Sequence, residues 1–162
     1  MKRIFLIILM LFIAAIIQAQ TNASKNIMRQ LIKENFALAD TQYRYMMTLT
    51  PADRLPQSYE EKDNKFISKD IDWWCSGFYP GTLWYIFEQT NDEAIKKEAE
   101  RSMDLLVPNE TNTGTRDLGV IMYCSFCNAY RLTKDEKYKD IIFRSAQSLS
   151  TRYRPSIKAI QS

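Results

Sequence analysis

Residues 72–106 read DWWCSGFYPGTLWYIFEQTNDEAIKKEAERSMDLL, and the order of apolar and polar segments in this stretch decides the fold. Its first half predicts a helix with Pro80 in the first turn, and the apolar run from Leu83 to Phe87 covers nearly all of its sides, which is typical of a buried helix. Between the halves, Thr90–Glu93 has the Thr-x-x-Glu form of a capping box. The second half carries apolar residues along one helical face only, at Ile95, Ala99, Met103 and Leu106. The stretch therefore predicts an inner helix, a short turn and an outer helix.

The same order recurs further along the chain. A second inner helix is predicted from Asp117 to about Leu132, and a second Thr-x-x-Glu turn at Thr133–Glu136 opens a second outer helix. Thr90 and Thr133 lie 43 residues apart, as do Trp74 and Asp117. Stacked hairpins of inner and outer helices form a helical solenoid or a closed α/α barrel. The sequence predicts an all-α fold of about five helices, an incomplete barrel whose next inner helix would begin near residue 160. The apolar face of the second outer helix comprises Tyr138, Ile141, Ser145 and Leu149.

Two segments precede this repeat. Between Lys25 and Met47, apolar residues recur every three or four positions, which predicts a helix with one apolar face. Pro51, Pro56 and the charged residues of 60–65 then predict a loop. The repeat is thus expected to follow one outer helix and an irregular connection.

The N-terminus has the pattern of a secretory signal peptide. Lys2 and Arg3 form a short basic region, residues 4–17 are an unbroken apolar run, and Ala19 supplies a small residue for cleavage. The run is shorter than a membrane span needs, although an uncleaved N-terminal anchor is the alternative. We therefore predict a signal peptide at 1–19 and a mature domain at 20–162. That domain would be exported to the periplasm or outside the cell, with no stable membrane insertion after cleavage.

Composition restricts the possible chemistry. The 22 Lys and Arg residues nearly balance the 19 Asp and Glu residues, and two of the basic residues fall in the leader. A nearly neutral mature chain lacks the basic surface typical of nucleic-acid binding. The chain has no histidine, which excludes Ser-His-Asp and Cys-His catalysis and histidine-based metal sites. Carboxylates are therefore the expected carriers of acid–base chemistry.

The three cysteines allow two interpretations. Cys124 and Cys127 have the Cys-x-x-Cys spacing of zinc or redox motifs, but a second such pair is missing from the sequence. Their neighbours are apolar, so we favour the interpretation that these two and Cys75 are small core residues.

The segments before the two inner helices hold the candidate site. In stacked hairpins the N-termini of all inner helices lie at one end, so we expect Trp73, Trp74, Tyr79 and Asp117 to gather around one mouth. Aromatic rings beside a carboxylate suit a sugar, because the rings stack on its apolar faces while the acid acts on the glycosidic oxygen. Two alternatives stay open: Asp117 is a helix N-cap, and at least one of the tryptophans is a core residue.

Two segments carry a family resemblance. Residues 72–85, DWWCSGFYPGTLWY, and the segment from Asp117-Leu118-Gly119 to Leu132 resemble the unsaturated glucuronyl hydrolases, glycoside hydrolase family 88. The similarity spans about Ile27 to Ser162. It implies a six-hairpin α/α toroid of more than twice this length. It also implies a hydrolase that removes 4,5-unsaturated uronic acid from the non-reducing end of lyase-generated oligosaccharides by vinyl-ether hydration, without a cofactor.

The resemblance also implies residue roles. Asp117 matches an essential catalytic Asp, and Trp74 matches a tryptophan that lines the sugar site; we add Tyr79 as a substrate-binding residue. One departure is Arg116, because the family usually has His there. The other is that the family's principal proton donor, a second Asp, lies on a later inner helix, beyond Ser162. We therefore expect a truncated chain that is inactive alone. The related unsaturated rhamnogalacturonyl hydrolases and a non-catalytic, sugar-binding remnant are the alternatives.

Overall fold

The computed structural model describes the backbone of residues 2–161 and the side chains of residue 18 and residues 20–161. The predicted signal peptide, residues 1–19, has all of its side chains outside this description except Gln18. Residues up to Leu38 form one unit, and residues from Ala39 onward form a second unit that holds everything described below as a site. Among the described residues, none of the helices combines the length and the apolar character that spanning a bilayer requires.

Helices cover each predicted helical segment, but the first begins at Lys2 instead of about Lys25, and the second inner helix is interrupted by a π-helical turn. In chain order they are α1 (Lys2–Leu49), α2 (Phe78–Thr90), α3 (Glu93–Leu106), α4 (Leu118–Met122), α5 (Asn128–Thr133) and α6 (Glu136–Ser150). The 3-10 turns are η1 (Glu61–Asp63) and η2 (Val107–Thr111), and a π-helical turn, η3 (Tyr123–Cys127), joins α4 to α5. The strands are β1 (Leu55–Glu60), β2 (Lys65–Lys69), β3 (Tyr153–Arg154) and β4 (Ala159–Ile160).

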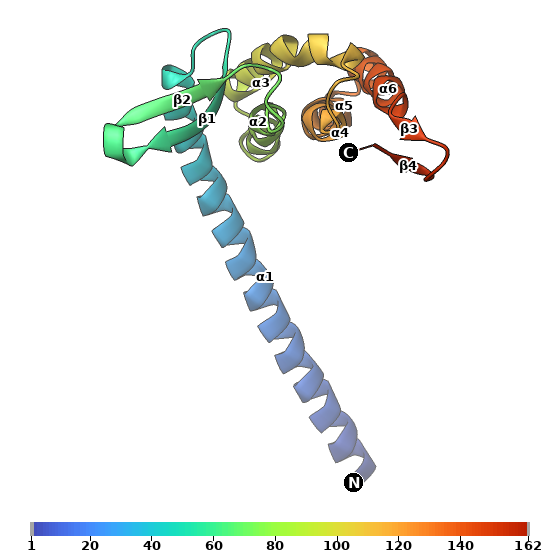
Figure 1. The fold of residues 1–162 in the computed structure, drawn as a ribbon. Helices are drawn as coiled ribbons and strands as arrows, with labels where there is room; N and C mark the ends of the chain where they lie inside the picture. The colour runs from blue at the N-terminus through green and yellow to red at the C-terminus, as the bar shows by residue number, and fades with distance from the viewer. Residues whose placement is uncertain (1, 162) are drawn as a thin grey trace. The chain divides into compact units, whose positions relative to one another are not determined.

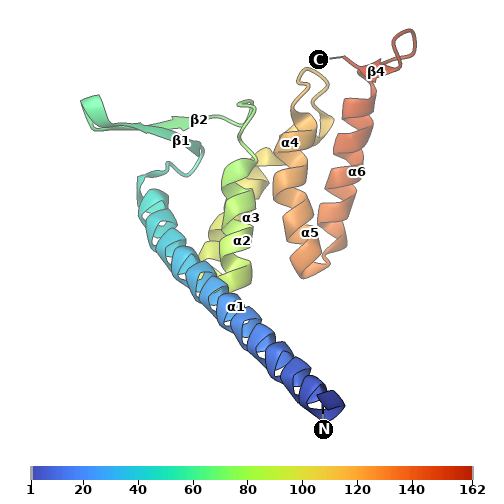
Figure 2. The same cartoon turned by 90° about the horizontal axis from the view of Figure 1, so that it is seen from below.

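The helices of the second unit form two layers, as the repeat predicted. The inner helices are α2 and the segment α4–η3–α5, which run side by side, and α3 and α6 form the outer layer (Figures 1 and 2). The predicted apolar faces of α3 and α6 turn into the core, where Ile95, Ala99, Met103 and Leu106 are fully buried. The fold is therefore a partial α/α toroid.

Trp84 joins the two hairpins at the centre of the core. Its side chain is 0% exposed, and its indole N–H lies 2.9 Å from the sulfur of Met103 on α3. Its ring also meets Tyr138 of α6 edge-on, with 6.5 Å between the ring centroids. One buried residue on an inner helix thus contacts both outer helices, so the hairpins share one hydrophobic core.

Two glycines let the inner helices approach closely. A Cβ atom at Gly77 would lie 1.9 Å from the carbonyl oxygen of Ile121, and one at Gly81 would lie 2.5 Å from that of Cys124. Both obstacles are backbone atoms that cannot rotate away. Glycine is therefore required at these positions by the contact between α2 and the second inner helix.

The turn between each inner and outer helix differs from the predicted capping box. The N-caps are Asp92 and Asp135, two residues after the predicted threonines, and their carboxylates accept hydrogen bonds from the backbone N–H groups of Ala94 (2.8 Å) and Lys137 (3.0 Å). Thr90 instead ends α2. The capping-box prediction was wrong because Asp is at least as good an N-cap as Thr and stands nearer the outer helix.

The predicted loop before the repeat is also wrong in part, because it contains a β-hairpin. Strands β1 and β2 pair antiparallel, with an irregularity in the pairing between Pro56 and Ser58. Asn64 makes the tight turn with φ of 49°, and the fully buried Leu55 anchors the hairpin to the core. Residues 151–161 form a second, two-residue hairpin, β3–β4, where the next inner helix was expected to begin.

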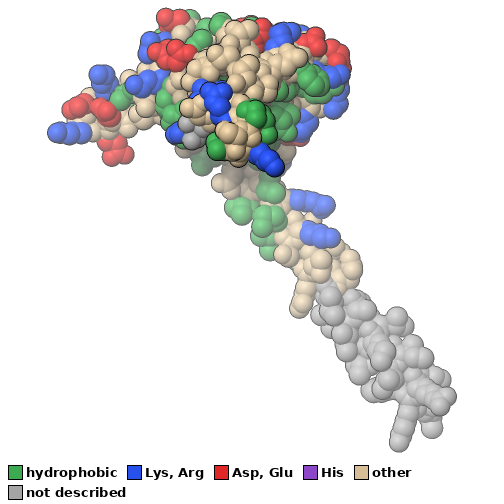
Figure 3. Space-filling model, turned by 45° about the vertical axis from the view of Figure 1, so that its right-hand side comes forward, with side chains coloured by type: hydrophobic (Ala, Val, Ile, Leu, Met, Phe, Trp, Pro, Cys, Tyr) green, Lys and Arg blue, Asp and Glu red, His purple; other side chains and the backbone are tan. Residues whose placement is uncertain are grey.

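The loop that leads into α2 is fixed by polar contacts. The amide of Asn109 in η2, only 2% exposed, donates to the carbonyl oxygen of Ile71 at 2.8 Å, and the Ser76 hydroxyl donates to the same oxygen at 3.0 Å. These bonds tie the 70–77 loop to the segment that follows α3. On the face drawn in Figure 3, acidic and basic side chains of the second unit are interspersed.

Candidate functional site

The two loops that precede the inner helices lie at the same end of the helical layers (Figure 2). The carbonyl oxygen of Asp117 accepts the first hydrogen bond of the second inner helix, from Ile121 N–H at 3.0 Å. Its carboxylate, however, makes no capping bond to α4, and the side chain is 33% exposed. Asp117 thus stands at the N-cap position without using its carboxylate as a cap, so this group is available for another role.

Besides Asp117, the two loops at this end of the layers, the mouth, carry a thiol, an indole and a guanidinium. Burial raises the pKa of the Cys75 thiol, and the negative charge of Asp117 raises that pKa further. Trp74, the residue before Cys75, is 53% exposed, with its ring edge-on to Phe78. The Arg116 guanidinium lies 3.9 Å from the Asp117 carboxylate. The loops that carry Trp74 and Asp117 thus lie at one end of the layers, and a shared sugar site formed by these two residues stays a prediction.

Tyr79 points away from this mouth. It is 6% exposed and stacks on Tyr43 of α1, with 6.0 Å between ring centroids and 9° between planes. Its hydroxyl donates to Glu98 at 2.9 Å, and Arg101 holds the same carboxylate with two further bonds of 2.6 and 2.7 Å. Burial and the negative charge of Glu98 raise the pKa of Tyr79 far above its usual range. Contact between Tyr79 and a substrate stays a prediction.

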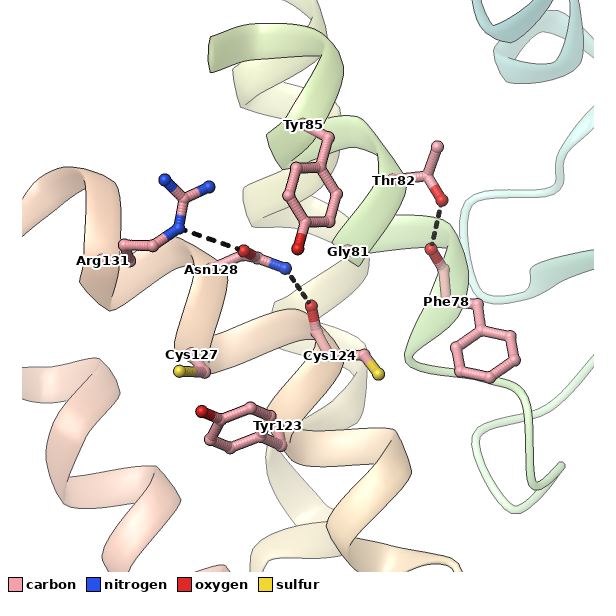
Figure 4. Close-up of a pocket in the computed structure, with 9 residues that line it drawn as sticks. All are labelled: Phe78, Gly81, Thr82, Tyr85, Tyr123, Cys124, Cys127, Asn128 and Arg131. Atoms are coloured by element: carbon pink, nitrogen blue, oxygen red, sulfur yellow. Dashed lines mark hydrogen bonds between the residues drawn. The ribbon is translucent and has the colours of Figure 1, made fainter.

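A groove of about 390 Å³ runs along the exposed face of the inner helices (Figure 4). Arg131 and Glu88 close one end with bonds of 2.6 and 2.7 Å, and the guanidinium lies 5.7 Å from the centre of the Tyr85 ring. The hydrogen bonds from Arg131 lower the pKa of Glu88. The lining consists of Phe78, Gly81, Thr82, Tyr85, Tyr123, Cys124, Cys127, Asn128 and Arg131.

Sequence reasoning missed this groove and took part of its lining for core. Cys75 is buried as expected, but Cys124 and Cys127 are half-buried and line the groove, so the core interpretation of that pair is wrong. A hydrogen bond with Cys127 raises the pKa of the exposed Tyr123. All three cysteines are free, and the described residues contain no cluster of three or more metal-ligating side chains. The missed signal is the 43-residue spacing of Glu88 and Arg131, two opposite charges in otherwise apolar helices.

A second cavity, the hairpin pocket, has a volume of about 340 Å³. It lies between the β1–β2 hairpin, the end of α1 and the start of α2. Trp73 is half-buried and lines this pocket, whereas the adjacent Trp74 is exposed and is not part of the lining. Phe78 lines both cavities. The lining of the hairpin pocket comprises Tyr43, Met46, Pro56, Gln57, Ser58, Tyr59, Phe66, Trp73, Cys75, Phe78 and Tyr79.

Comparison with known proteins gives consistent matches. An unsaturated glucuronyl hydrolase of Formosa agariphila is 31% identical over an alignment of 169 positions, gaps included, which covers 100% of this chain and 42% of that protein. An unsaturated glucuronyl hydrolase of Bacillus sp. (strain GL1) is 28% identical over 112 residues, 67% of this chain and 29% of that protein. An unsaturated chondroitin disaccharide hydrolase of Streptococcus pyogenes serotype M1 is 28% identical over 95 residues, 57% of this chain and 24% of that protein.

A solved structure agrees with these sequences. The crystal structure of an unsaturated glucuronyl hydrolase specific for heparin superposes with a TM-score of 0.74 and 32% identity, covering 80% of this chain and 35% of that one. No protein-family model matches the sequence. The chain thus spans less than half the length of the relatives that it matches.

Proposed function

We infer that this chain, which belongs with the unsaturated glucuronyl hydrolases in sequence and fold, provides part of the active site of such a hydrolase. The substrate would be an oligosaccharide that ends in a 4,5-unsaturated uronic acid. The observation that supports the proposal is the Asp117 carboxylate, which is accessible, makes no capping bond and belongs to a loop at the same end of the helical layers as the loop of the exposed Trp74.

The proposed reaction is hydration of a vinyl ether. A carboxylic acid protonates C4 of the C4=C5 double bond, and water adds at C5 and gives up a proton to a base. The resulting hemiketal opens at the C5–O5 bond to a ketone, and the hemiacetal left at C1 collapses to an aldehyde and releases the remaining saccharide as an alcohol. Such proton transfers need two groups of opposite protonation state. Within this chain we assign one of them to Asp117. The family resemblance assigns the other, the proton donor, to an Asp outside residues 1–162.

The neighbours of Asp117 have matching roles in this proposal. The exposed face of Trp74 offers a stacking surface for the uronate ring. Arg116 places a positive charge at the mouth, which suits the negatively charged carboxylate of the substrate. Tyr79 contributes indirectly, because its bond to Glu98 fixes the start of α2, where Phe78 and Trp74 meet.

Substitution of Asp117 tests the proposal. We expect residues 1–162 alone to bind an unsaturated chondroitin disaccharide without converting it. A chimera that adds the part of the Formosa agariphila relative beyond the matched region should remove the ultraviolet absorbance of the double bond. Asp117→Asn in the chimera should slow that loss by about a thousandfold, the scale of a lost acid–base group.

The matched control is Asp135→Asn, which changes an exposed N-cap to another good cap and should leave the rate unchanged. An Asp117→Asn chimera with full activity would contradict the proposal. Turnover by residues 1–162 alone would show that a second Asp from outside the chain is not needed.

We also propose that residues 1–19 direct export. The basic pair, the apolar run of residues 4–17 and the small residue Ala19 support this proposal. The mass of the chain recovered outside the cytoplasm should correspond to cleavage after Ala19, and recovery of an uncleaved chain only from the cytoplasm would contradict it.

A further inference from the structure

The hairpin pocket differs from the mouth in its charge. Its eleven lining residues include five aromatic rings besides Tyr79, and none of the eleven carries a charge. The mouth, by contrast, holds Asp117 and Arg116. A cavity of about 340 Å³ with aromatic walls and a few polar groups has the character of a small-molecule site. Its ligand should be uncharged, since burial of an unpaired charge is unfavourable.

The strand irregularity at Gln57 shapes one wall of this pocket. In a regular strand alternate side chains point to opposite faces, so four consecutive residues would not line one cavity. Here the pairing shifts between Pro56 and Ser58, and residues 56–59 all contribute to the lining. Strand bulges redirect side chains in this way and occur often beside active sites. The bulge adds the amide of Gln57 and the hydroxyl of Ser58 to an otherwise apolar wall.

The opposite wall and the floor are held in place by packing. The stacked rings of Tyr43 and Tyr79 form the floor. The Tyr79 hydroxyl donates a hydrogen bond to Glu98 and so holds its ring in place. The hairpin itself is tied down by Arg54, which donates to the hydroxyl and carbonyl oxygens of Ser68 at 3.2 and 3.3 Å. Because both sides are fixed, the pocket is preformed, which reduces the entropy lost when a ligand binds.

The pocket adjoins the proposed catalytic mouth. Cys75 lines the pocket and directly follows Trp74 in the chain. Phe78 lines the pocket and meets Trp74 edge-on, with 6.1 Å between centroids. A saccharide with one ring at Trp74 and Asp117 therefore has its neighbouring ring near the hairpin pocket.

We propose that the hairpin pocket binds the uncharged sugar ring attached to the unsaturated uronate, the ring that leaves when the bond is hydrolysed. This inference rests on the proposed function and assigns a second ring position to the same site. Aromatic faces of Phe66 and Tyr59 would stack on the ring, while Gln57 and Ser58 would bond its hydroxyl groups.

Binding of a saturated, neutral sugar tests the pocket without any catalysis. The probe is methyl N-acetyl-β-galactosaminide, and the readout is its NMR titration against the 162-residue chain, followed at the indole N–H of Trp73. Phe66→Ala should raise the dissociation constant about tenfold, the upper end of the range for one aromatic stacking contact. Tyr59→Ala, at a more exposed position, should raise it less and serves if Phe66→Ala unfolds.

Phe143→Ala is the matched control, because it removes an exposed phenyl ring on α6, outside the pocket, and should leave the dissociation constant unchanged. Methyl glucuronide, the charged counterpart of the probe, should bind the wild-type chain at least about tenfold more weakly. Absence of binding by the neutral probe, or binding that neither pocket variant weakens, would overturn the inference even if the unsaturated disaccharide is recognised. Binding of the neutral probe as expected, with no recognition of the unsaturated disaccharide, would refute the proposed function and leave the pocket as a sugar site.

Discussion

The two helical hairpins of this chain are alike at one end and different at the other. At the turn, Asn91 and Lys134 lie 43 residues apart, and both adopt the left-handed conformation, with φ of 55° and 59°. The residues that follow them, Asp92 and Asp135, cap the outer helices with the same hydrogen bond. The turn thus repeats in backbone conformation as well as in sequence pattern.

At the mouth the two hairpins differ. The first inner helix begins at Phe78 and the second at Leu118, three residues earlier in the 43-residue frame. The second helix also contains the π-helical turn Tyr123–Cys127, whereas α2 is regular. π-Helical turns occur often at functional sites. The turns between inner and outer helices are therefore the same in both hairpins, whereas the inner helices differ at the end that carries the candidate site residues.

The contact between the hairpins should be the most sensitive feature. Gly77→Ala would place a Cβ atom against the backbone of Ile121, so we expect it to lower the free energy of unfolding by about 3 kcal/mol or more. Urea denaturation followed by circular dichroism measures this change.

Gly119→Ala is the matched control for that substitution. A Cβ at Gly119 would lie 3.3 Å from Cδ2 of Leu149, the end of a flexible side chain, and alanine is the better helix former by about 1 kcal/mol. We expect a change between zero and a gain of about 1 kcal/mol. Equal destabilisation by both substitutions would show that the hairpins are not packed backbone to backbone at Gly77.

The three helix-starting aspartates should separate into two classes. Asp135→Ala removes a cap and should lower the free energy of unfolding by about 1 kcal/mol, and Asp92→Ala by somewhat more because Asp92 also pairs with Arg44. Asp117→Ala, which removes no capping bond, should cost less than about 0.5 kcal/mol. Thermal and urea unfolding check these values, and an Asp117→Ala loss equal to that of Asp135→Ala would restore the N-cap interpretation.

The smallest effect should come from the Glu88–Arg131 pair, which joins equivalent positions of the two hairpins. A double-mutant cycle with Glu88→Gln and Arg131→Met should give a coupling of about 0.5 kcal/mol, because both side chains are partly exposed. Arg131 lowers the pKa of Glu88 below its ordinary value of 4.5. The coupling should therefore be complete above pH 4.5 and disappear as the pH falls through the lowered pKa. A coupling that persists at pH 2 would contradict the ionic origin.

The sequence predicted the helical part of the fold because a helix with one buried face carries an apolar residue at every third or fourth position. The stripe of Ile95, Ala99 and Met103 could be read directly, and the repeat followed from it. The β1–β2 hairpin left no such trace, since its strands are short and mostly exposed and one begins with the Leu55-Pro56 pair. The π-helical turn was also invisible, because a segment apolar on all sides shows no period that an extra residue could interrupt.

The sequence predicted only those site residues whose location follows directly from the loop that carries them. Trp74 and Asp117 follow from the loops that hold them, and both side chains are accessible in the structure, while their joint role in one site stays a prediction. The groove and the hairpin pocket depend on which faces of packed elements remain open, which periodicity alone does not indicate. Tyr79 illustrates the difference: its neighbours in sequence are at the mouth, but the helix turns its ring toward α1 and Glu98.

The buried amide of Asn109 has a consequence for production of the protein. Asn109-Glu110-Thr111 is an acceptor sequence for N-linked glycans, yet in the folded chain the Asn109 nitrogen is bonded to the Ile71 carbonyl and shielded from any transferase. A glycan attached during synthesis would occupy the space of the 70–77 loop and prevent its closure. In a glycosylating host, folding and sugar attachment would therefore compete for this amide. Asn109→Asp would remove the acceptor but also the hydrogen bond, because a carboxylate cannot donate to the Ile71 carbonyl.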